Sequence, residues 1–276
     1  MANEATVDRA AFKEFERLGY SRAASIYRGE TARVTSQVNE PLLDAIGAKP
    51  GMRMLDVACG PGRLSGAAAK RGCIVTGLDY AEPMVNYAKE AFPDITFRVG
   101  DAEALPFEAE QFDLVTCSLG ILHFADPDQA MREARRVLVT GGRYAFTCWV
   151  PPARNPFMAL ILGSVQKHGT TDLPLPPGPP MFRFGEPAEC ERTVREIGMK
   201  VVSTTELSIE WDFDSPEQVV PIITGSTARL APMLSLQAPE QRRDVERAIT
   251  EGARQYLKAG RVSIPAPITL VVASKT

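Results

Sequence analysis

The stretch from Met52 to Arg71 places the strongest constraint on how this 276-residue chain can fold. Residues 52–57 are an apolar run that predicts a buried parallel strand. A turn carrying Gly60 and Gly62 follows, and a helix is expected over 63–71. Glycines let a backbone approach a ligand closely, and the first N–H groups of a helix offer free donors. A strand, a glycine turn and a helix in this order are typical of nucleotide binding, although short Gly-x-Gly turns alone occur in many folds.

Strands and helices alternate after residue 52, which predicts right-handed βαβ units and a parallel sheet. The clearest helix is expected over 128–138, with Asp126 as its N-cap and Pro127 at its first position. Gly141 and Gly142 are predicted to end it. The expected strands are 52–57, 73–78, 95–99, 112–118 and 142–149, followed after an irregular stretch by 199–210 and 264–273.

Composition narrows the class of protein. The formal net charge is −3 with both signs interspersed, so no basic surface for nucleic acid is indicated. No apolar run is long enough to span a bilayer, and the polar, acidic N-terminus does not resemble a leader peptide. The five cysteines form no Cys-x-x-Cys pair, which predicts reduced thiols in a cytoplasmic protein and no metal site. The oligomeric state stays open, a homodimer being one option.

Three aspartates stand at the ends of successive predicted strands. Asp56 ends the first, Asp79 ends the second, and Asp101 follows the third. Ligands bind at the carboxyl edge of an open parallel sheet. A carboxylate after the second strand can accept both hydroxyls of a ribose, and one after the third can accept the amine of adenine. Each residue also has a structural interpretation, as a helix cap or a turn cap. Together the three predict an adenosine site.

The motifs that carry these aspartates resemble those of the class I S-adenosylmethionine-dependent methyltransferases. The resemblance is strongest to the group of ubiquinone/menaquinone-type and natural-product small-molecule methyltransferases. It implies an α/β, Rossmann-like sheet of seven mostly parallel strands with an antiparallel last strand, and S-adenosyl-L-methionine as cofactor. Ala58 departs from the family pattern, which often has glycine there. The matching stretches are Leu55 to Gly62, Leu78 to Tyr80 with Met84, Gly100 to Phe107, and Arg136 to Gly142.

The resemblance also implies roles for individual residues. Gly60 and Gly62 would pass under the methionine part of the cofactor, and Asp79 would hold the ribose. Tyr80 and Met84 would flank adenine. The adenine edge would be read by Asp101 and Ala102, and the sulfonium side would be lined by Ser118 and Leu119. With Asp56 and Ala58 of the glycine loop, these are the expected cofactor-binding residues.

The acceptor side is less constrained by the sequence. His123 lies just beyond the fourth predicted strand, and an imidazole there can act as a general base near neutral pH; its structural interpretation is a loop histidine that bonds backbone. Tyr20 and Tyr27 can lie over the sulfonium, where an aromatic face stabilises a cation, or they can be helix packing. Aromatic residues that can line an apolar acceptor pocket, or simply fill the core, are Trp149, Phe157, Phe182, Phe184 and Trp211.

Four segments follow from this interpretation. Residues 1–47 are expected to form a helical lid, in which a helix over 6–18 stops at Gly19 and Tyr20. The cofactor-binding core is expected over 48–150. A proline-rich insertion and a helix should occupy 151–198, with a stiff surface loop and no regular structure over most of 150–185. Residues 199–276 should supply the last two strands of the sheet, with a helical acceptor cap inserted at 215–260.

The predicted function is methyl transfer from S-adenosylmethionine to a nitrogen, oxygen or carbon of a small, apolar or aromatic metabolite. Alignment and desolvation are expected to drive the in-line displacement. One alternative is an NAD-dependent oxidoreductase, although Ser65 stands where the third glycine of the dinucleotide pattern belongs. Another is a protein that binds the cofactor without transferring its methyl group.

Overall fold

The computed structural model describes residues 8–276, so the beginning of the predicted lid and the predicted lack of a leader lie outside the described residues. Its main sheet has seven strands in the order β3-β2-β1-β4-β5-β10-β6. Only β10 runs antiparallel to both of its neighbours. The predicted Rossmann-like sheet with an antiparallel last strand is confirmed. The strands are β1 Arg53–Val57, β2 Ile74–Asp79, β3 Thr96–Val99, β4 Phe112–Cys117, β5 Leu138–Trp149, β6 Met199–Leu207 and β10 Ile268–Lys275.

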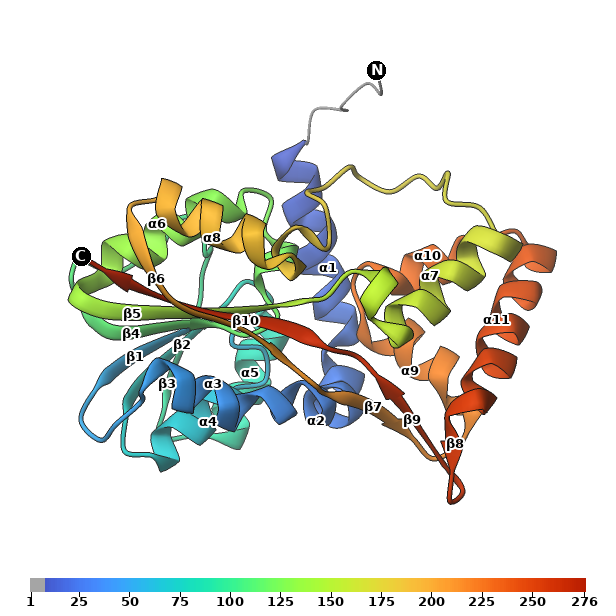
Figure 1. The fold of residues 1–276 in the computed structure, drawn as a ribbon, viewed down its shortest axis with the longest axis horizontal. Coiled ribbons are helices and arrows are strands. Elements are labelled where there is room, and N and C mark those ends of the chain that lie inside the picture. The colour runs from blue at the N-terminus through green and yellow to red at the C-terminus, as the bar shows by residue number, and fades with distance from the viewer. Residues whose placement is uncertain (1–7) are drawn as a thin grey trace.

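Helices cover both faces of this sheet, as a parallel sheet requires. Figure 1 shows α6 and α8 over one face and α3 and α4 over the other. The inner strands β1, β4 and β5 are therefore buried along most of their length. The flanking helices are α3 Asn39–Ile46, α4 Arg63–Lys70, α5 Glu82–Ala91, α6 Pro127–Val137 and α8 Pro187–Glu196.

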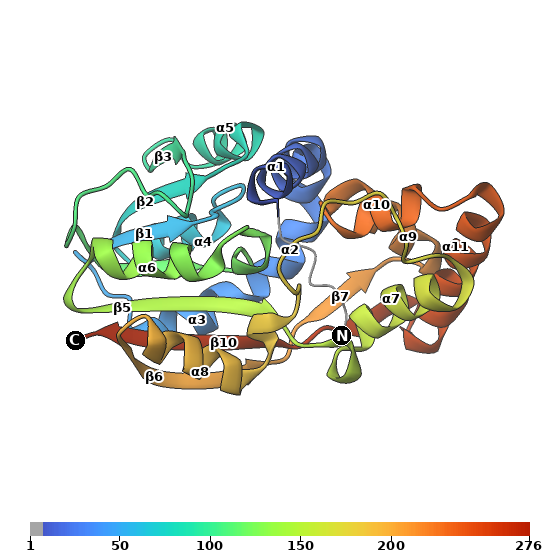
Figure 2. The ribbon, with the colours of Figure 1, turned by 90° about the horizontal axis from the view of Figure 1, so that it is seen from above.

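Helix α1 runs without a break from Arg9 to Ile26, so the predicted stop at Gly19 and Tyr20 is wrong. Gly19 is a point of close contact: a Cβ atom placed there would lie 2.6 Å from the Cβ of Ala228. The glycine lets α1 pack against the segment that follows α9 (Val219–Ser226). Figures 1 and 2 show α1 at the end of the sheet, between the core and the helices α9 and α10. Short helical segments then lead to α3: η1 Tyr27–Thr31, α2 Ala32–Thr35 and η2 Ser36–Val38.

A second unit of helices and strands extends from the end of the main sheet (Figure 1). The predicted strands 199–210 and 264–273 are each two strands, because the chain leaves the main sheet partway along. At the break the N–H of Ala266 donates to the carbonyl of Ile209 at 2.8 Å, and Pro267 has no N–H to offer. This unit, called the cap below, contains α7 Pro156–His168, α9, α10 Leu230–Ser235 and α11 Pro239–Ala253, with a sheet of β7 Glu210–Phe213, β8 Leu257–Lys258 and β9 Arg261–Pro265.

Two further expectations need correction. Helix α7 occupies part of 150–185, where no regular structure was predicted; Pro156 begins it, and the side chain of Asn155 accepts the Met158 N–H at 3.0 Å. Residues 169–182 are the stretch without helix or strand. Strand β5 begins at Leu138, since Gly141 at φ +79° lies in an irregular part of the strand and not in the turn that ends α6.

The expectations about cysteines and membranes can also be compared with the fold. All five cysteines are unpaired, as the sequence predicts, and all five are buried. Within residues 8–276, no helix combines the length and the apolar character that a bilayer crossing needs.

A buried carboxylate joins the centre of the sheet to α4. The side chain of Asp56 on β1 accepts the hydroxyl of Ser65 at 2.6 Å and that of Thr116 on β4 at 3.0 Å. Burial raises the pKa of Asp56 to about 6, against an ordinary value of 3.8, although the hydrogen bonds from Ser65 and Thr116 oppose the shift. The ionised form of Asp56 therefore costs folding free energy at neutral pH.

Asp56→Asn tests this cost. Between about pH 4 and pH 6 the unfolded chain has lost the Asp56 proton while the folded chain keeps it, so wild type loses stability as pH rises through that window. Asparagine does not titrate. The free energy of unfolding of wild type should therefore fall, relative to the variant, by on the order of 3 kcal/mol between pH 4 and pH 7. Urea unfolding of both proteins at several pH values measures the difference, and a difference that is independent of pH would contradict the account.

Candidate functional site

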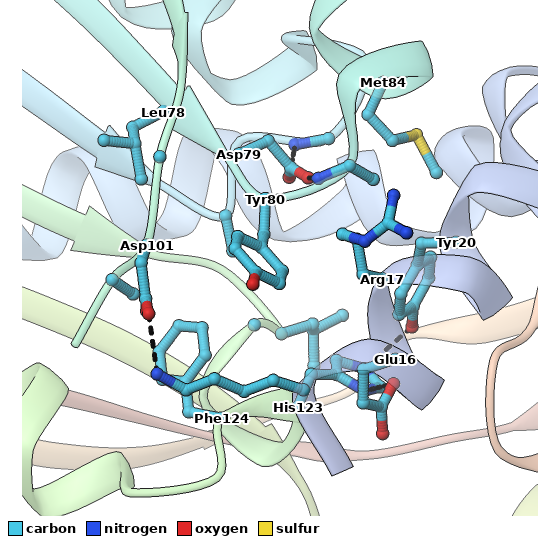
Figure 3. A pocket seen from close by; sticks show the side chains of 18 of the residues that line it. Glu16, Arg17, Tyr20, Leu78, Asp79, Tyr80, Met84, Asp101, His123 and Phe124 are labelled. Carbon is cyan, nitrogen blue, oxygen red and sulfur yellow. Dashed lines mark hydrogen bonds and ion pairs between the residues drawn. The ribbon is translucent and has the colours of Figure 1, made fainter. Parts of the chain in front are cut away.

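A cavity opens at the carboxyl edge of the main sheet, where β1, β2, β3 and β4 end. With its open mouth it has a volume of about 790 Å³. Figure 3 shows Tyr80 between Asp79 and Asp101, and Glu16, Tyr20 and His123 gathered next to α1. We call this opening at the carboxyl edge of the main sheet the sheet-edge cavity. It is lined by Lys13, Glu16, Arg17, Tyr20, Tyr27, Ala58, Gly60, Leu78, Asp79, Tyr80, Ala81, Met84, Gly100, Asp101, Ala102, Glu103, Ser118, Leu119, Gly120, His123 and Phe124.

Asp79 organises the part of this cavity next to the glycine loop. One of its carboxylate oxygens accepts the N–H of Gly60 at 2.8 Å and the other accepts the N–H of Ala81 at 2.9 Å. Burial raises the pKa of Asp79 above its ordinary value, and these two bonds oppose the shift. Gly60 has φ +53°, and a Cβ atom there would meet only the Tyr27 ring, at 4.0 Å. The backbone of the glycine loop is therefore open toward the cavity.

Asp101 is held from the opposite side by α1. The ammonium group of Lys13 lies 2.6 Å from a carboxylate oxygen of Asp101 and 2.8 Å from one of Glu103. Burial opposes the charged ammonium, but the bonds to Asp101 and Glu103 raise the pKa of Lys13 above its usual value. Glu103 also accepts the backbone N–H groups of Ala125 and Asp126. These contacts fasten α1 over the ends of β3 and β4.

Twelve of the fourteen residues predicted from sequence line this one cavity. Asp56 and Gly62 do not. The side chain of Asp56 is turned to Ser65 and Thr116 inside the core, and Gly62 stands at φ +78° where a Cβ atom would lie 2.9 Å from the Phe97 ring. Asp56 joins β1 to α4 and β4, and Gly62 lets the start of α4 pack closely against β3 and α5. The residues that line the cavity are Tyr20, Tyr27, Ala58, Gly60, Asp79, Tyr80, Met84, Asp101, Ala102, Ser118, Leu119 and His123.

His123 takes part in a hydrogen-bonded chain with two side chains of α1. Its Nδ1 lies 3.0 Å from a carboxylate oxygen of Glu16, and its Nε2 lies 2.7 Å from the hydroxyl oxygen of Tyr20. Glu16 is 4% exposed, and its second oxygen has the guanidinium of Arg229 as its nearest cation, at 3.8 Å. Because an ionised carboxylate only accepts hydrogen bonds, the N–H of Nδ1 donates to Glu16. The two ring nitrogens of His123 are thus held between the Glu16 carboxylate and the Tyr20 hydroxyl.

A second cavity lies between the core and the cap, on the other side of the hydrogen-bonded side chains of Glu16, His123 and Tyr20. It shares Tyr20, Tyr27, Leu119 and His123 with the first, and with its mouth has a volume of about 560 Å³. We call it the cap cavity. Phe182 and Phe184, which were predicted as candidate lining, do not line it. Its other residues are Thr31, Thr35, Leu122, Trp149, Phe157, Met158, Met181, Trp211, Ser226, Thr227, Ala228, Arg229 and Leu230.

The sequence analysis missed Lys13, Glu16 and Arg229, which complete the two cavities. A signal for the first two is present in the sequence, because Lys13, Glu16 and Tyr20 follow one another at helical spacing and share one face of α1. Arg229 has no such signal, since it stands between two short helices whose packing brings it to Glu16.

Comparison with known proteins assigns the core of this fold. Residues 55–146 match the family model described as a methyltransferase domain. The chain carries a methyltransferase domain. The matched residues run from within β1 through most of β5 and include the ends of the four strands that border the sheet-edge cavity.

Relatives and solved structures extend the likeness beyond the methyltransferase domain. A demethylmenaquinone methyltransferase of Renibacterium salmoninarum is 41% identical over 116 residues, 42% of this chain and 49% of the relative. A ubiquinone biosynthesis O-methyltransferase of Coxiella burnetii is 30% identical over 160 residues, 56% of this chain and 66% of the relative. The chain spans about half the length of the first of these relatives. A geranyl diphosphate methyltransferase solved in complex with SAM shares the fold, with a TM-score of 0.53 at 20% identity over 98% of this chain and 96% of that one.

Lys13→Met should loosen α1. The substitution leaves the carboxylates of Asp101 and Glu103 without their shared cation, and unpaired charged partners cost roughly 1–3 kcal/mol. We expect amide hydrogen exchange across α1 to become about tenfold faster than in wild type. Arg9→Met is the matched control, because Arg9 is also on α1 and pairs with Asp126 but is 65% exposed. Exposed pairs contribute little, so equal acceleration in both variants would show that Lys13 does not fasten the helix.

Proposed function

We propose that this chain transfers a methyl group from S-adenosylmethionine to a nitrogen, oxygen or carbon of a small apolar or aromatic molecule. The observation that carries the proposal is the pair of cavities that meet at Tyr20, Tyr27, Leu119 and His123. One is bordered by carboxylates at successive strand ends, which suits a nucleoside. The other is bordered by aromatic and aliphatic side chains, which suits an apolar acceptor.

The residues of the sheet-edge cavity fit the adenosyl cofactor. Asp79 would accept the ribose hydroxyls, since each carboxylate oxygen has a lone pair beyond the one that its backbone partner uses. Asp101 and Ala102 would face the adenine edge, with Tyr80 and Met84 beside the ring. The open backbone at Gly60 leaves room for the methionine part. When bound, the cofactor supplies an electrophilic methyl group on a sulfonium.

Alignment and exclusion of water are the main contributions that the chain itself would make. Tyr20 and Tyr27 stand where the two cavities meet, their ring centroids 5.9 Å apart. Aromatic faces there stabilise a sulfonium cation, and holding two reactants in line is worth on the order of 7–11 kcal/mol in model systems. In this proposal, residues before β1 serve as a lid and the cap serves as the acceptor-binding unit.

The names of the relatives support an acceptor with an apolar ring. Both are named for quinones, and the aromatic lining of the cap cavity agrees with such a molecule or with an aromatic natural product.

We propose a cytoplasmic protein, because five unpaired thiols suit a reducing compartment. The partner is a small molecule, with neither nucleic acid nor membrane required, and a homodimer remains an open option.

Two other functions use the same cavity. An NAD-dependent oxidoreductase would also need a carboxylate at Asp79, and a cofactor-binding protein would need no acceptor at all. Calorimetric titration of the purified protein with S-adenosylmethionine and with NAD distinguishes the oxidoreductase from the proposed methyltransferase. Release of S-adenosylhomocysteine in the presence of aromatic acceptors distinguishes methyl transfer from binding of the cofactor alone.

Asp79→Asn should weaken binding of S-adenosylmethionine by one to two orders of magnitude while the fold survives. The variant loses a charged acceptor for the ribose, and hydrogen bonds to charged groups contribute roughly 1.5–3 kcal/mol. Calorimetry measures the affinity. Asp94→Asn is the control, since Asp94 is exposed in the turn before β3. Unchanged affinity in Asp79→Asn would reduce Asp79 to a cap for the glycine loop and α5.

A further inference from the structure

Two residues that line the cap cavity have a buried polar side-chain atom without a hydrogen-bond partner. Among the described residues, the hydroxyl of Thr31 and the indole N–H of Trp211 are buried and have no hydrogen-bond partner. Both residues line the cap cavity and both are 3% exposed. Leaving such groups unpaired is costly, so each native example calls for an explanation. An oxygen of a bound molecule would give the indole N–H the acceptor that it lacks.

The walls of the cap cavity favour a flat ring. The rings of Phe157 and Trp211 are stacked, with centroids 4.6 Å apart and planes 7° apart, and Phe213 continues the stack behind them. Trp149 adds a further aromatic face to the lining. Flat aromatic molecules bury much area against such surfaces at little conformational cost.

The charges around this cavity suit an acceptor oxygen that loses a proton. None of the described residues that line it is Asp or Glu, and the charged side chain that it does contain is Arg229. An oxygen that gains negative charge as its proton leaves would be stabilised by the guanidinium.

We propose that the acceptor is a flat aromatic molecule with a reacting hydroxyl group, bound in the cap cavity, and that its proton leaves through Tyr20 to His123 with Glu16 as the positioning residue. The proposal rests on the proposed function, because it names the acceptor class and the proton path of that same reaction. Tyr20 and His123 line both cavities, so the hydrogen-bonded side chains of Glu16, His123 and Tyr20 lie where acceptor and methyl donor would meet.

The proton path follows from the hydrogen bonds in place. The acceptor hydroxyl gives its proton to the Tyr20 oxygen as Tyr20 gives its own proton to His123 Nε2, 2.7 Å away. The acceptor oxygen forms a bond to the methyl carbon while the carbon–sulfur bond breaks, and sulfur keeps that electron pair as a neutral thioether. The imidazolium that results is stabilised by Glu16 and later loses its proton to water. Burial holds the pKa of Tyr20 well above 10, so Tyr20 relays a proton and does not ionise.

Binding can be tested without knowing the natural acceptor. The chain has two tryptophans, Trp149 and Trp211, and both line the cap cavity. Tryptophan fluorescence, with calorimetry as a second measure, therefore reports occupancy of this cavity. With S-adenosylhomocysteine present, 2,3-dihydroxynaphthalene should bind saturably and at least tenfold more tightly than naphthalene. Thr31→Val, which keeps the shape and removes the hydroxyl, should weaken the diol about threefold or more without changing the affinity for S-adenosylhomocysteine.

The proton path is tested by turnover of the same diol against pH. His123→Asn and Tyr20→Phe should each lower kcat about a hundredfold or more. Glu16→Gln should lower kcat about tenfold with KM unchanged. It should also move the acid limb of the profile to lower pH, because the carboxylate no longer favours the protonated imidazole. The charged and titratable groups around His123 are Glu16 and Tyr20, which contact it from α1, Arg229 of the cap, which lies next to Glu16, and Asp79 at the end of β2. Glu14→Gln, on the exposed side of α1, should leave both rate and profile unchanged.

The outcomes separate this proposal from the proposed function. Methylation of 2-naphthylamine with none of the diol, or equal binding of diol and naphthalene, would overturn the hydroxyl acceptor and leave methyl transfer intact. A Glu16→Gln profile identical in shape to that of wild type would overturn the proton path. Failure to bind S-adenosylmethionine would overturn both.

Discussion

The pairing of α1 with the carboxyl edge of the sheet is the interaction on which the rest of the site depends. Lys13 reaches Asp101 and Glu103, and Glu16 reaches His123, within two turns of one helix. These contacts turn an open strand edge into a cavity with a wall. They also place Tyr20 of the same helix where the two cavities meet.

Helix α1 is held over the sheet edge by ion pairs as well as by apolar packing. Ion pairs that are partly buried gain little net stability, because desolvation offsets their attraction. Pairs of this kind can open when a ligand offers competing partners. Asp101, for which we propose a role at the adenine edge, already has Lys13 beside it. A nucleoside bound there would compete with a contact that fastens α1.

The core could be predicted from sequence because its signals are local. The strand, glycine turn and helix around Gly60 and the aspartates at strand ends depend only on chain order. They predicted the sheet correctly, and a cavity lies at the sheet edge to which they pointed. The errors arose where tertiary contacts decide. Gly19 marks a point where α1 packs closely against the cap, and it does not end the helix. Each of the two predicted strands 199–210 and 264–273 is divided in two, because the chain passes there between the main sheet and the sheet of the cap. Arg229 reaches Glu16 only through the packing of that cap.

The most direct test of the account is a crystal structure with S-adenosylhomocysteine bound. The account predicts the adenosine part between Asp79 and Asp101 and the sulfur directed to the junction of the two cavities, within reach of Tyr20 and His123. A ligand bound elsewhere, or one whose sulfur is turned away from the cap cavity, would contradict it.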